Sequence, residues 1–148
     1  MTDAAPRLLS TVYTSVATEP FDDDALSELL VSSRAANGRA QITGMLLHRE
    51  GRFIQFLEGP ERTVRMLLAK IATDRRHARI RTLLEDPIDT RQFAEWTMGF
   101  ERTDDTDASV PDGFRRSFDD LEHGGDEALM RQAARDLTVW FRARVRPA

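Results

Sequence analysis

The chain lacks cysteine altogether, which excludes disulfides, thiolate metal sites and cysteine nucleophiles. It also lacks long apolar runs: none approaches the roughly 20 residues of a membrane-spanning helix. The N-terminal residues 1–7 have neither the basic stretch nor the apolar run of a secretory signal. These absences predict a cytoplasmic protein with no membrane partner.

The net charge and the absence of catalytic motifs exclude further classes of protein. With 21 basic and 25 acidic residues, the net charge of −4 argues against direct nucleic-acid binding. The sequence has no glycine-rich or Walker-type phosphate loop, and its three histidines are scattered, so no metal site is expected. No catalytic triad or evident acid–base pair is present, which favours a protein that is not an enzyme.

The 148 residues fit one domain, and 41% hydrophobic with 31% charged residues is typical of a globular chain. Alternating residues predict a strand over 7–15. A helix should begin at Asp22–Asp24 and end near Asn37-Gly38. Strands over 41–49 and 52–58, joined by Glu50-Gly51, form a predicted hairpin.

The second half of the chain continues the pattern. Pro60 suits the first turn of a helix whose apolar stripe contains Val64, Leu67, Leu68 and Ile71. Strands are predicted over 79–85, ending before Pro87, and over 96–102. The order βαββαββ predicts an α+β, ferredoxin-like sheet with two helices on one face. A C-terminal helix over 126–146 should cover the other face or form a dimer.

One residue is unusual on physical grounds. Gln55 lies in Phe53-Ile54-Gln55-Phe56-Leu57, a strand that is apolar on both faces. A buried amide has donors and an acceptor to satisfy, and leaving them unpaired costs about 1–3 kcal/mol. Gln55 therefore bonds a backbone group or water, or lies near an edge of the sheet, or faces a ligand that has both donors and acceptors.

Several short motifs follow one another between residues 7 and 102. They are, in order, Tyr13-Thr14-Ser15-Val16-Ala17, Asn37, Ile42-Thr43-Gly44, Phe53-Ile54-Gln55-Phe56-Leu57-Glu58-Gly59 and Trp96-Thr97-Met98. Taken together, they resemble the BLUF family of blue-light sensors that use FAD. Singly, each has an ordinary structural explanation, such as a core aromatic or a helix cap. In this order and at these separations they resemble the family's pattern, and the predicted βαββαββ order agrees with its fold.

The resemblance implies a photoswitch and a non-covalently bound flavin, which is FAD or, as the alternative, FMN. It implies light-driven electron and proton transfer from Tyr13 and rearrangement of Gln55, with Trp96 and Met98 beside the flavin on the fifth strand. Residues that match the family's flavin-contacting positions are Tyr13, Leu29, Ser33, Asn37, Ile42, Gln55, Lys70, Asp74, Arg76 and His77. Ala36 departs from the family, where an amide or imidazole is common, and Gln41 departs from a common glycine.

The resemblance covers about residues 7–102, and we expect residues 1–103 to form a flavin-binding domain and 104–148 a linker and helical cap. That remainder is too short for an output enzyme. The signal is therefore expected to leave through the fifth strand and the C-terminal helix, a homodimer or higher oligomer, or a separate effector protein. Two alternatives stay open: a flavin-free ferredoxin-like interaction module, and, less favoured, a small flavoenzyme.

Overall fold

The computed structural model describes residues 7–18, 23–49, 51–75, 77–103 and 126–144. Five strands form one sheet in the order β4-β1-β3-β2-β5. Their bounds are β1 Leu8–Ala17, β2 Thr43–Arg49, β3 Arg52–Pro60, β4 His77–Ile88 and β5 Gly99–Thr103. The first four pair antiparallel, and β5 adds to β2 in parallel. This arrangement confirms the predicted ferredoxin-like α+β class.

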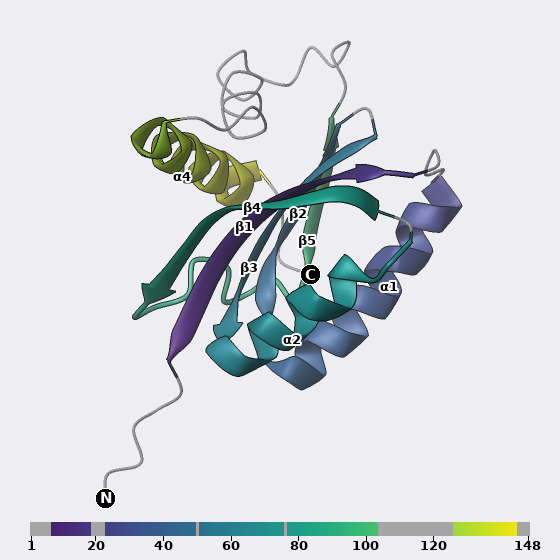
Figure 1. Ribbon diagram of the computed structural model, residues 1–148, viewed down its shortest axis with the longest axis horizontal. Helices are drawn as coiled ribbons and strands as arrows, with labels where there is room; N and C mark the ends of the chain where they lie inside the picture. Colours follow the sequence, from purple (N-terminus) through teal and green to yellow (C-terminus); the bar gives the residue numbers. More distant parts are fainter. Residues whose placement is uncertain (1–6, 19–22, 50, 76, 104–125, 145–148) are drawn as a thin grey trace, which may run out of the picture.

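Helices cover both faces of the sheet (Figure 1). Helix α1 (Asp23–Ala40) and helix α2 (Glu61–Ala72) lie together on one face, and α4 (Glu127–Arg144) crosses the other. Strand side chains alternate between faces, so Tyr13 packs with α1 and α2 while its neighbour Val12 packs with α4. The described residues therefore form two separate hydrophobic cores, one on each side of the sheet.

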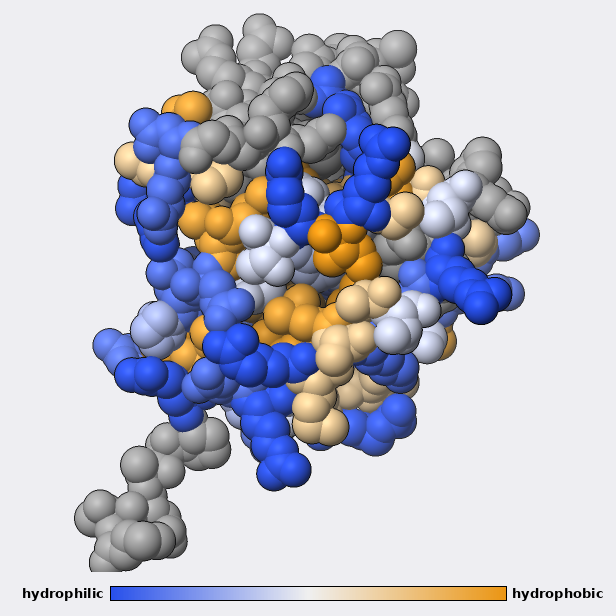
Figure 2. Space-filling model, viewed as in Figure 1, coloured by the Kyte–Doolittle hydropathy of each residue, from blue (hydrophilic) through white to orange (hydrophobic). Residues whose placement is uncertain are grey.

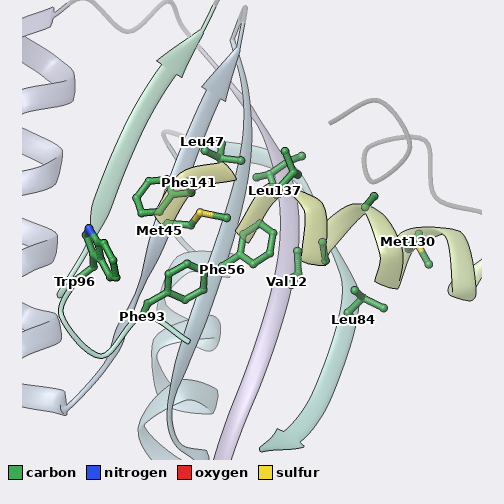
Figure 3. Close-up of a cluster of buried hydrophobic side chains, with 13 residues drawn as sticks. Val12, Met45, Leu47, Phe56, Leu84, Phe93, Trp96, Met130, Leu137 and Phe141 are labelled. Carbon is green, nitrogen blue, oxygen red and sulfur yellow. The ribbon is translucent and has the colours of Figure 1, made fainter. Parts of the chain in front are cut away.

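The core under α4 is almost entirely apolar (Figure 3). Leu137 and Phe141 are fully buried, and Phe141 lies so close to Gly99 that a Cβ there would stand 2.2 Å from the ring. Arg131 of α4 also pairs with Asp86 of β4. Its Nη1 lies 2.5 Å from Asp86 Oδ2 and its Nη2 lies 2.9 Å from Asp86 Oδ1. The helix predicted over 126–146 thus covers the open face of the sheet, as expected.

Helix α1 ends later than the sequence indicated. It continues through Asn37 and Gly38 to Ala40, and Gln41 adopts the left-handed conformation with φ of 60°. The Ile42 N–H donates to the Asn37 carbonyl at 2.9 Å, and the Gln41 N–H donates to the Gly38 carbonyl at 3.4 Å. These are the two bonds of a Schellman motif, so the helix stop lies at Gln41 and not at Gly38.

Three strand predictions also need correction. Strand β4 starts earlier than 79 and runs through Pro87, which pairs with Leu9. It is an edge strand, where a proline is tolerated because one row of backbone groups has no ladder partner to satisfy. The strand predicted over 96–102 begins only at Gly99, and that predicted over 41–49 begins at Thr43. Pro60 is the N-cap of α2, one residue outside the helix.

Figure 2 shows hydrophilic residues over the outer parts of this view, with hydrophobic residues nearer its centre. Within the described ranges, no helix is long and apolar enough to cross a membrane. Residues 104–125, which include the proposed domain boundary, lie outside the described part of the chain.

Candidate functional site

A pocket opens between α1, α2 and the sheet. Helix α1 lines it with side chains spaced by three or four residues, which places them on one helical face. The segment from α2 to the residue after its cap contributes a second such stripe, and the strands supply the floor. The lining residues are Tyr13, Leu29, Ser32, Ser33, Ala36, Asn37, Leu46, Gln55, Leu67, Lys70, Ile71 and Asp74.

Tyr13 and Gln55 form the centre of this floor. They are direct partners in the pairing of β1 with β3, and the Tyr13 hydroxyl donates a hydrogen bond to Gln55 Oε1. Tyr13 is 1% exposed and Gln55 is 8% exposed. Burial raises the pKa of the Tyr13 phenol above its ordinary value, and the negative charge of Asp74 raises it further. The phenol therefore holds its proton firmly.

The other end of the Gln55 amide is also engaged. Its Nε2 donates to Met98 Sδ at 3.4 Å, and a thioether sulfur is a weak acceptor. The buried amide is thus placed between a phenol that donates to it and a sulfur that accepts from it. Both of these partners are side chains, and β3 is a central strand. A weak partner on one side makes this amide cheaper to rearrange than one held by two strong bonds.

Helix α1 holds the backbone beside Met98. Asn37 Nδ2 donates to the Thr97 carbonyl at 2.9 Å, and Arg34 Nε donates to the Met98 carbonyl at 3.0 Å. Asn37 is 2% exposed and also lines the pocket. Helix α1 therefore both borders the pocket and hydrogen-bonds to the segment that places Met98 beside Gln55.

Trp96 lies on the opposite side of the sheet from Met98. It packs with Phe93 and Phe141, at ring-centroid distances of 6.4 and 5.8 Å, in the core under α4 (Figure 3). Its Nε1 is buried without a hydrogen-bond partner in the described part of the chain. Trp96 therefore stands away from the pocket in this structure, whereas the resemblance places both Trp96 and Met98 beside the flavin. Alternation along a strand does not apply to them, because both precede β5.

Comparison with known proteins identifies the fold and its family. A family model described as sensors of blue-light using FAD, abbreviated BLUF, matches residues 8–99. The chain belongs to the BLUF family. Flavin is the group that this family uses to sense blue light, as the family description states.

Two curated relatives show how the BLUF domain is used elsewhere. The chain is 37% identical over 92 residues to photoactivated adenylate cyclase subunit beta of Euglena gracilis. These 92 residues are 62% of this chain and 11% of that protein. It is 32% identical over 88 residues to the blue light- and temperature-regulated antirepressor BluF of Escherichia coli, covering 60% and 22% of the two chains. The chain thus spans about a tenth to a fifth of these relatives.

Solved structures agree with the BLUF assignment. The dark-state structure of BlrB, a BLUF protein, aligns with a TM-score of 0.72 and 27% identity, covering 87% of this chain and 96% of that one. A bacterial light-regulated adenylyl cyclase aligns with a TM-score of 0.67 and 27% identity, covering 88% of this chain and 36% of that one. BLUF domains are therefore sensor modules that occur alone and joined to effector domains.

The structure brings to one pocket most of the residues that the resemblance matches to flavin-contacting positions. Besides Tyr13, Asn37 and Gln55, the lining residues foreseen in the sequence are Leu29, Ser33, Lys70 and Asp74. Ile42 does not line the pocket. It is 1% exposed, in the core on the same face. Arg76 lies outside the described residues, and His77 is described only as the first residue of β4.

Four lining residues were not foreseen: Ser32, Leu46, Leu67 and Ile71. Leu46 lies in β2, and the other three lie in the two helices, where helical spacing indicated them. Leu67 and Ile71 share the stripe of Lys70 and Asp74, and Ser32 shares that of Leu29 and Ser33. Helical spacing alone could not show that these stripes face each other across a gap. Ala36 lies on the pocket wall, so its departure from the family pattern falls within the site.

Proposed function

We propose that this BLUF protein is a blue-light photoreceptor whose switch consists of Tyr13 and Gln55, with Met98 as the third member. The observation that carries the proposal is the chain of contacts on the pocket floor. The Tyr13 hydroxyl donates to Gln55 Oε1, and Gln55 Nε2 donates to Met98 Sδ. Gln55 also lines the pocket, so a change in a bound group reaches this amide directly.

The residues of the pocket fit a flavin. Leu29, Leu46, Leu67 and Ile71 supply apolar walls suited to a planar ring, while Asn37 and Gln55 supply amide donors and acceptors for the ring's polar edge. Lys70 supplies positive charge at the α2 side, where the anionic part of the cofactor would lie. FAD is the cofactor that we propose, in keeping with the family description, and FMN would use the same ring contacts.

A bound flavin supplies a chromophore that absorbs blue light and becomes a strong oxidant. The protein's contribution is a phenol that keeps its proton in the dark, because burial and Asp74 raise the pKa of Tyr13. With a flavin held there, Tyr13 would be the donor of an electron and a proton to that oxidant, the Gln55 amide would relay the proton, and both would return to Tyr13, so that only the hydrogen-bond arrangement changes. Rotation or tautomerisation of the amide exchanges its donor and acceptor ends, which changes its bonds to Tyr13 and Met98.

The signal is proposed to leave through the segment that joins Met98 to Trp96. Met98 contacts the switch, and two residues earlier Trp96 packs against Phe141 of α4. A shift of Met98 therefore acts on both faces of the sheet, and α4 becomes the readout for a dimer partner or a separate effector protein. In this scheme residues 1–103 form the flavin-binding domain and 104–148 the linker and helical cap.

The test is an absorption spectrum of the purified protein in darkness and after blue light. We expect a yellow protein whose flavin bands move to longer wavelength on illumination and recover in the dark. Tyr13→Phe should bind flavin and lose the reversible shift, because no hydroxyl remains to donate to Gln55. A colourless protein that takes up neither FAD nor FMN would contradict the proposal and favour a flavin-free interaction module.

A further inference from the structure

A buried carboxylate lies three residues after Gln55 on the same strand. Glu58 of β3 is 2% exposed and points to the face opposite the pocket, as its pairing partner Thr43 does. Its Oε2 accepts hydrogen bonds from the Thr43 hydroxyl and from the Phe93 N–H, and its Oε1 accepts one from the Gln92 N–H, all at 2.8 Å. One carboxylate thus binds the start of the segment that joins β4 to β5.

Arg91 adds further hydrogen bonds to the residues around Glu58. Its Nη1 donates to the Thr43 hydroxyl at 2.9 Å and to the Glu58 carbonyl at 3.4 Å, and its Nη2 donates to the Gln41 carbonyl at 2.7 Å. We call Thr43, Glu58, Arg91 and the backbone of Gln92 and Phe93 the Glu58 clamp. Each of the two carboxylate oxygens of Glu58 accepts a hydrogen bond from a backbone N–H, so the clamp needs both oxygens as acceptors.

The clamped segment leads directly to the switch. The Trp96 N–H donates to the Phe93 carbonyl at 2.9 Å, and the Gly44 N–H donates to the Trp96 carbonyl at 3.0 Å. Asn37 and Arg34 then hold the carbonyls of Thr97 and Met98. The segment is therefore fixed at its start by the strand that carries Gln55, and near its end by the helix that lines the pocket.

We propose that Glu58 is a positioning residue for the photoswitch. By holding Gln92 and Phe93, it sets the segment so that Trp96 stays under α4 and Met98 reaches the Gln55 amide. It does not line the pocket, so it acts through the segment and not through contact with flavin. The inference deepens the proposed function and rests on it, since it assigns a residue that sets the lifetime of the switched state.

The experiment compares Glu58→Gln with the unaltered protein, both with flavin bound. An amide side chain keeps one acceptor oxygen where the carboxylate has two, so at least one backbone N–H loses its partner. We expect hydrogen exchange at the Gln92 or Phe93 amide to rise about fivefold or more, the factor that corresponds to one lost hydrogen bond. Dark recovery after blue light should be about two- to fivefold faster, because a looser Met98 lowers the barrier to amide rearrangement.

Two controls separate this effect from loss of charge or of packing. Glu85→Gln removes the same charge from an exposed residue of β4 that pairs with Arg65, and should leave exchange and recovery unchanged. Thr43→Val removes the hydroxyl that donates to Glu58, at nearly constant side-chain size, and should make dark recovery moderately faster. Thr43→Ser keeps a hydroxyl and should recover at the rate of the unaltered protein. If Glu58→Gln does not fold, the Thr43 pair decides the question.

The outcomes are distinct. Recovery of Glu58→Gln equal to that of Glu85→Gln would overturn the positioning role, even with faster exchange at Gln92 and Phe93, because the clamp would then be only structural. Faster exchange with faster recovery supports the role. Absence of any light-induced shift in the unaltered protein would instead contradict the proposed function itself.

Discussion

The two faces of the sheet are built from the same strands but have different contents. On the pocket face, polar side chains are buried among apolar ones: Tyr13, Gln55 and Asn37 are each at most 8% exposed. On the α4 face, the neighbouring strand positions Val12, Ile54 and Phe56 are apolar and pack against an apolar helix stripe. At the middle of the sheet, alternation along β1 and β3 thus places the hydrogen bonds of Tyr13 and Gln55 on one face and apolar packing on the other, while the Glu58 clamp lies nearer the end of β3 on the α4 face.

This division has a physical reason. Apolar burial stabilises in proportion to area and without direction, so the α4 core can tolerate small shifts. A buried hydrogen-bond network has few satisfied arrangements, and exchanging one for another changes its geometry in discrete steps. The pocket face is therefore suited to switching, and the α4 face to holding the fold. The predictions below test this division, from the largest expected effect to the smallest.

The largest effect is expected at the switch. Gln55→Leu should retain flavin and lose the light-induced spectral shift completely, because a leucine can neither accept from Tyr13 nor donate to Met98. The measurement is the difference spectrum between dark and illuminated protein. The same substitution at Gln132, an exposed residue of α4, should leave the shift intact, and a normal shift in Gln55→Leu would refute the assignment.

On the other face, Leu137→Ala should act on stability and not on the spectrum. Leu137 is fully buried in the α4 core, and such a truncation costs about 2–5 kcal/mol of unfolding free energy. Urea denaturation measures this, while the flavin absorption bands should stay in place. Val139→Ala, at a position that is 69% exposed, should change stability by at most about 0.5 kcal/mol. A large spectral change in Leu137→Ala would break the division between the faces.

Ionisation of Tyr13 gives an intermediate effect. It is the only tyrosine, so the phenolate absorbance of the chain reports this residue alone. Because the folded pKa is raised, Tyr13 binds its proton more tightly in the folded state than in the unfolded one. Its contribution to stability is complete below pH of about 10, the ordinary tyrosine pKa, and is lost as pH rises toward the raised value.

The titration should therefore show no phenolate near pH of about 10 in the folded protein, while protein unfolded in urea titrates there. Asp74→Asn should lower the folded pKa in part, since burial is the larger cause of the shift and Asp74 the smaller. Titration of the Tyr13 phenol in the folded protein at its ordinary pKa of about 10 would contradict this expectation and show that the pocket floor is open to water.

The smallest effect is expected at the end of α1, which borders the pocket. Gln41 has a φ of 60°, a conformation that costs most residues about 1–2 kcal/mol and glycine much less. After the loss of backbone entropy that glycine brings, Gln41→Gly should stabilise the protein by about 0.5 kcal/mol, measured by denaturation. Gln92→Gly, outside any helix or strand, serves as a comparison and should not stabilise.

Element order was largely predictable from the sequence, because alternation and helical spacing are local properties. The strand over 52–58 and the stripe through Val64 and Ile71 both appear in the structure. The failures had two causes. Gly38 resembles a helix stop, yet the helix continues to Ala40 because the Schellman bonds close at Gln41, which is a competing local signal. Pro87 lies within a strand because that strand is at the edge of the sheet, which only the tertiary structure decides.

The candidate site shows the same contrast. Gln55 was identifiable because an amide in an apolar strand is costly, and Tyr13 and Asn37 were identifiable from the family motifs. The hydrogen bonds of Glu58 were not predictable, because its donors come from Thr43 and from backbone groups 34 and 35 residues further along the chain. A residue type gives no indication of which distant backbone N–H groups it will bind.

By itself, the sequence determined which side chains share a face, and so which strand residues could meet the helices and which could meet the C-terminal segment. Period and composition are enough for that. Only the tertiary structure decided that Trp96 and Met98, two residues apart, lie on opposite faces, because the backbone there belongs to no strand. It also decided which partners satisfy the buried amide of Gln55, since hydrogen bonds depend on distances that chain folding alone sets.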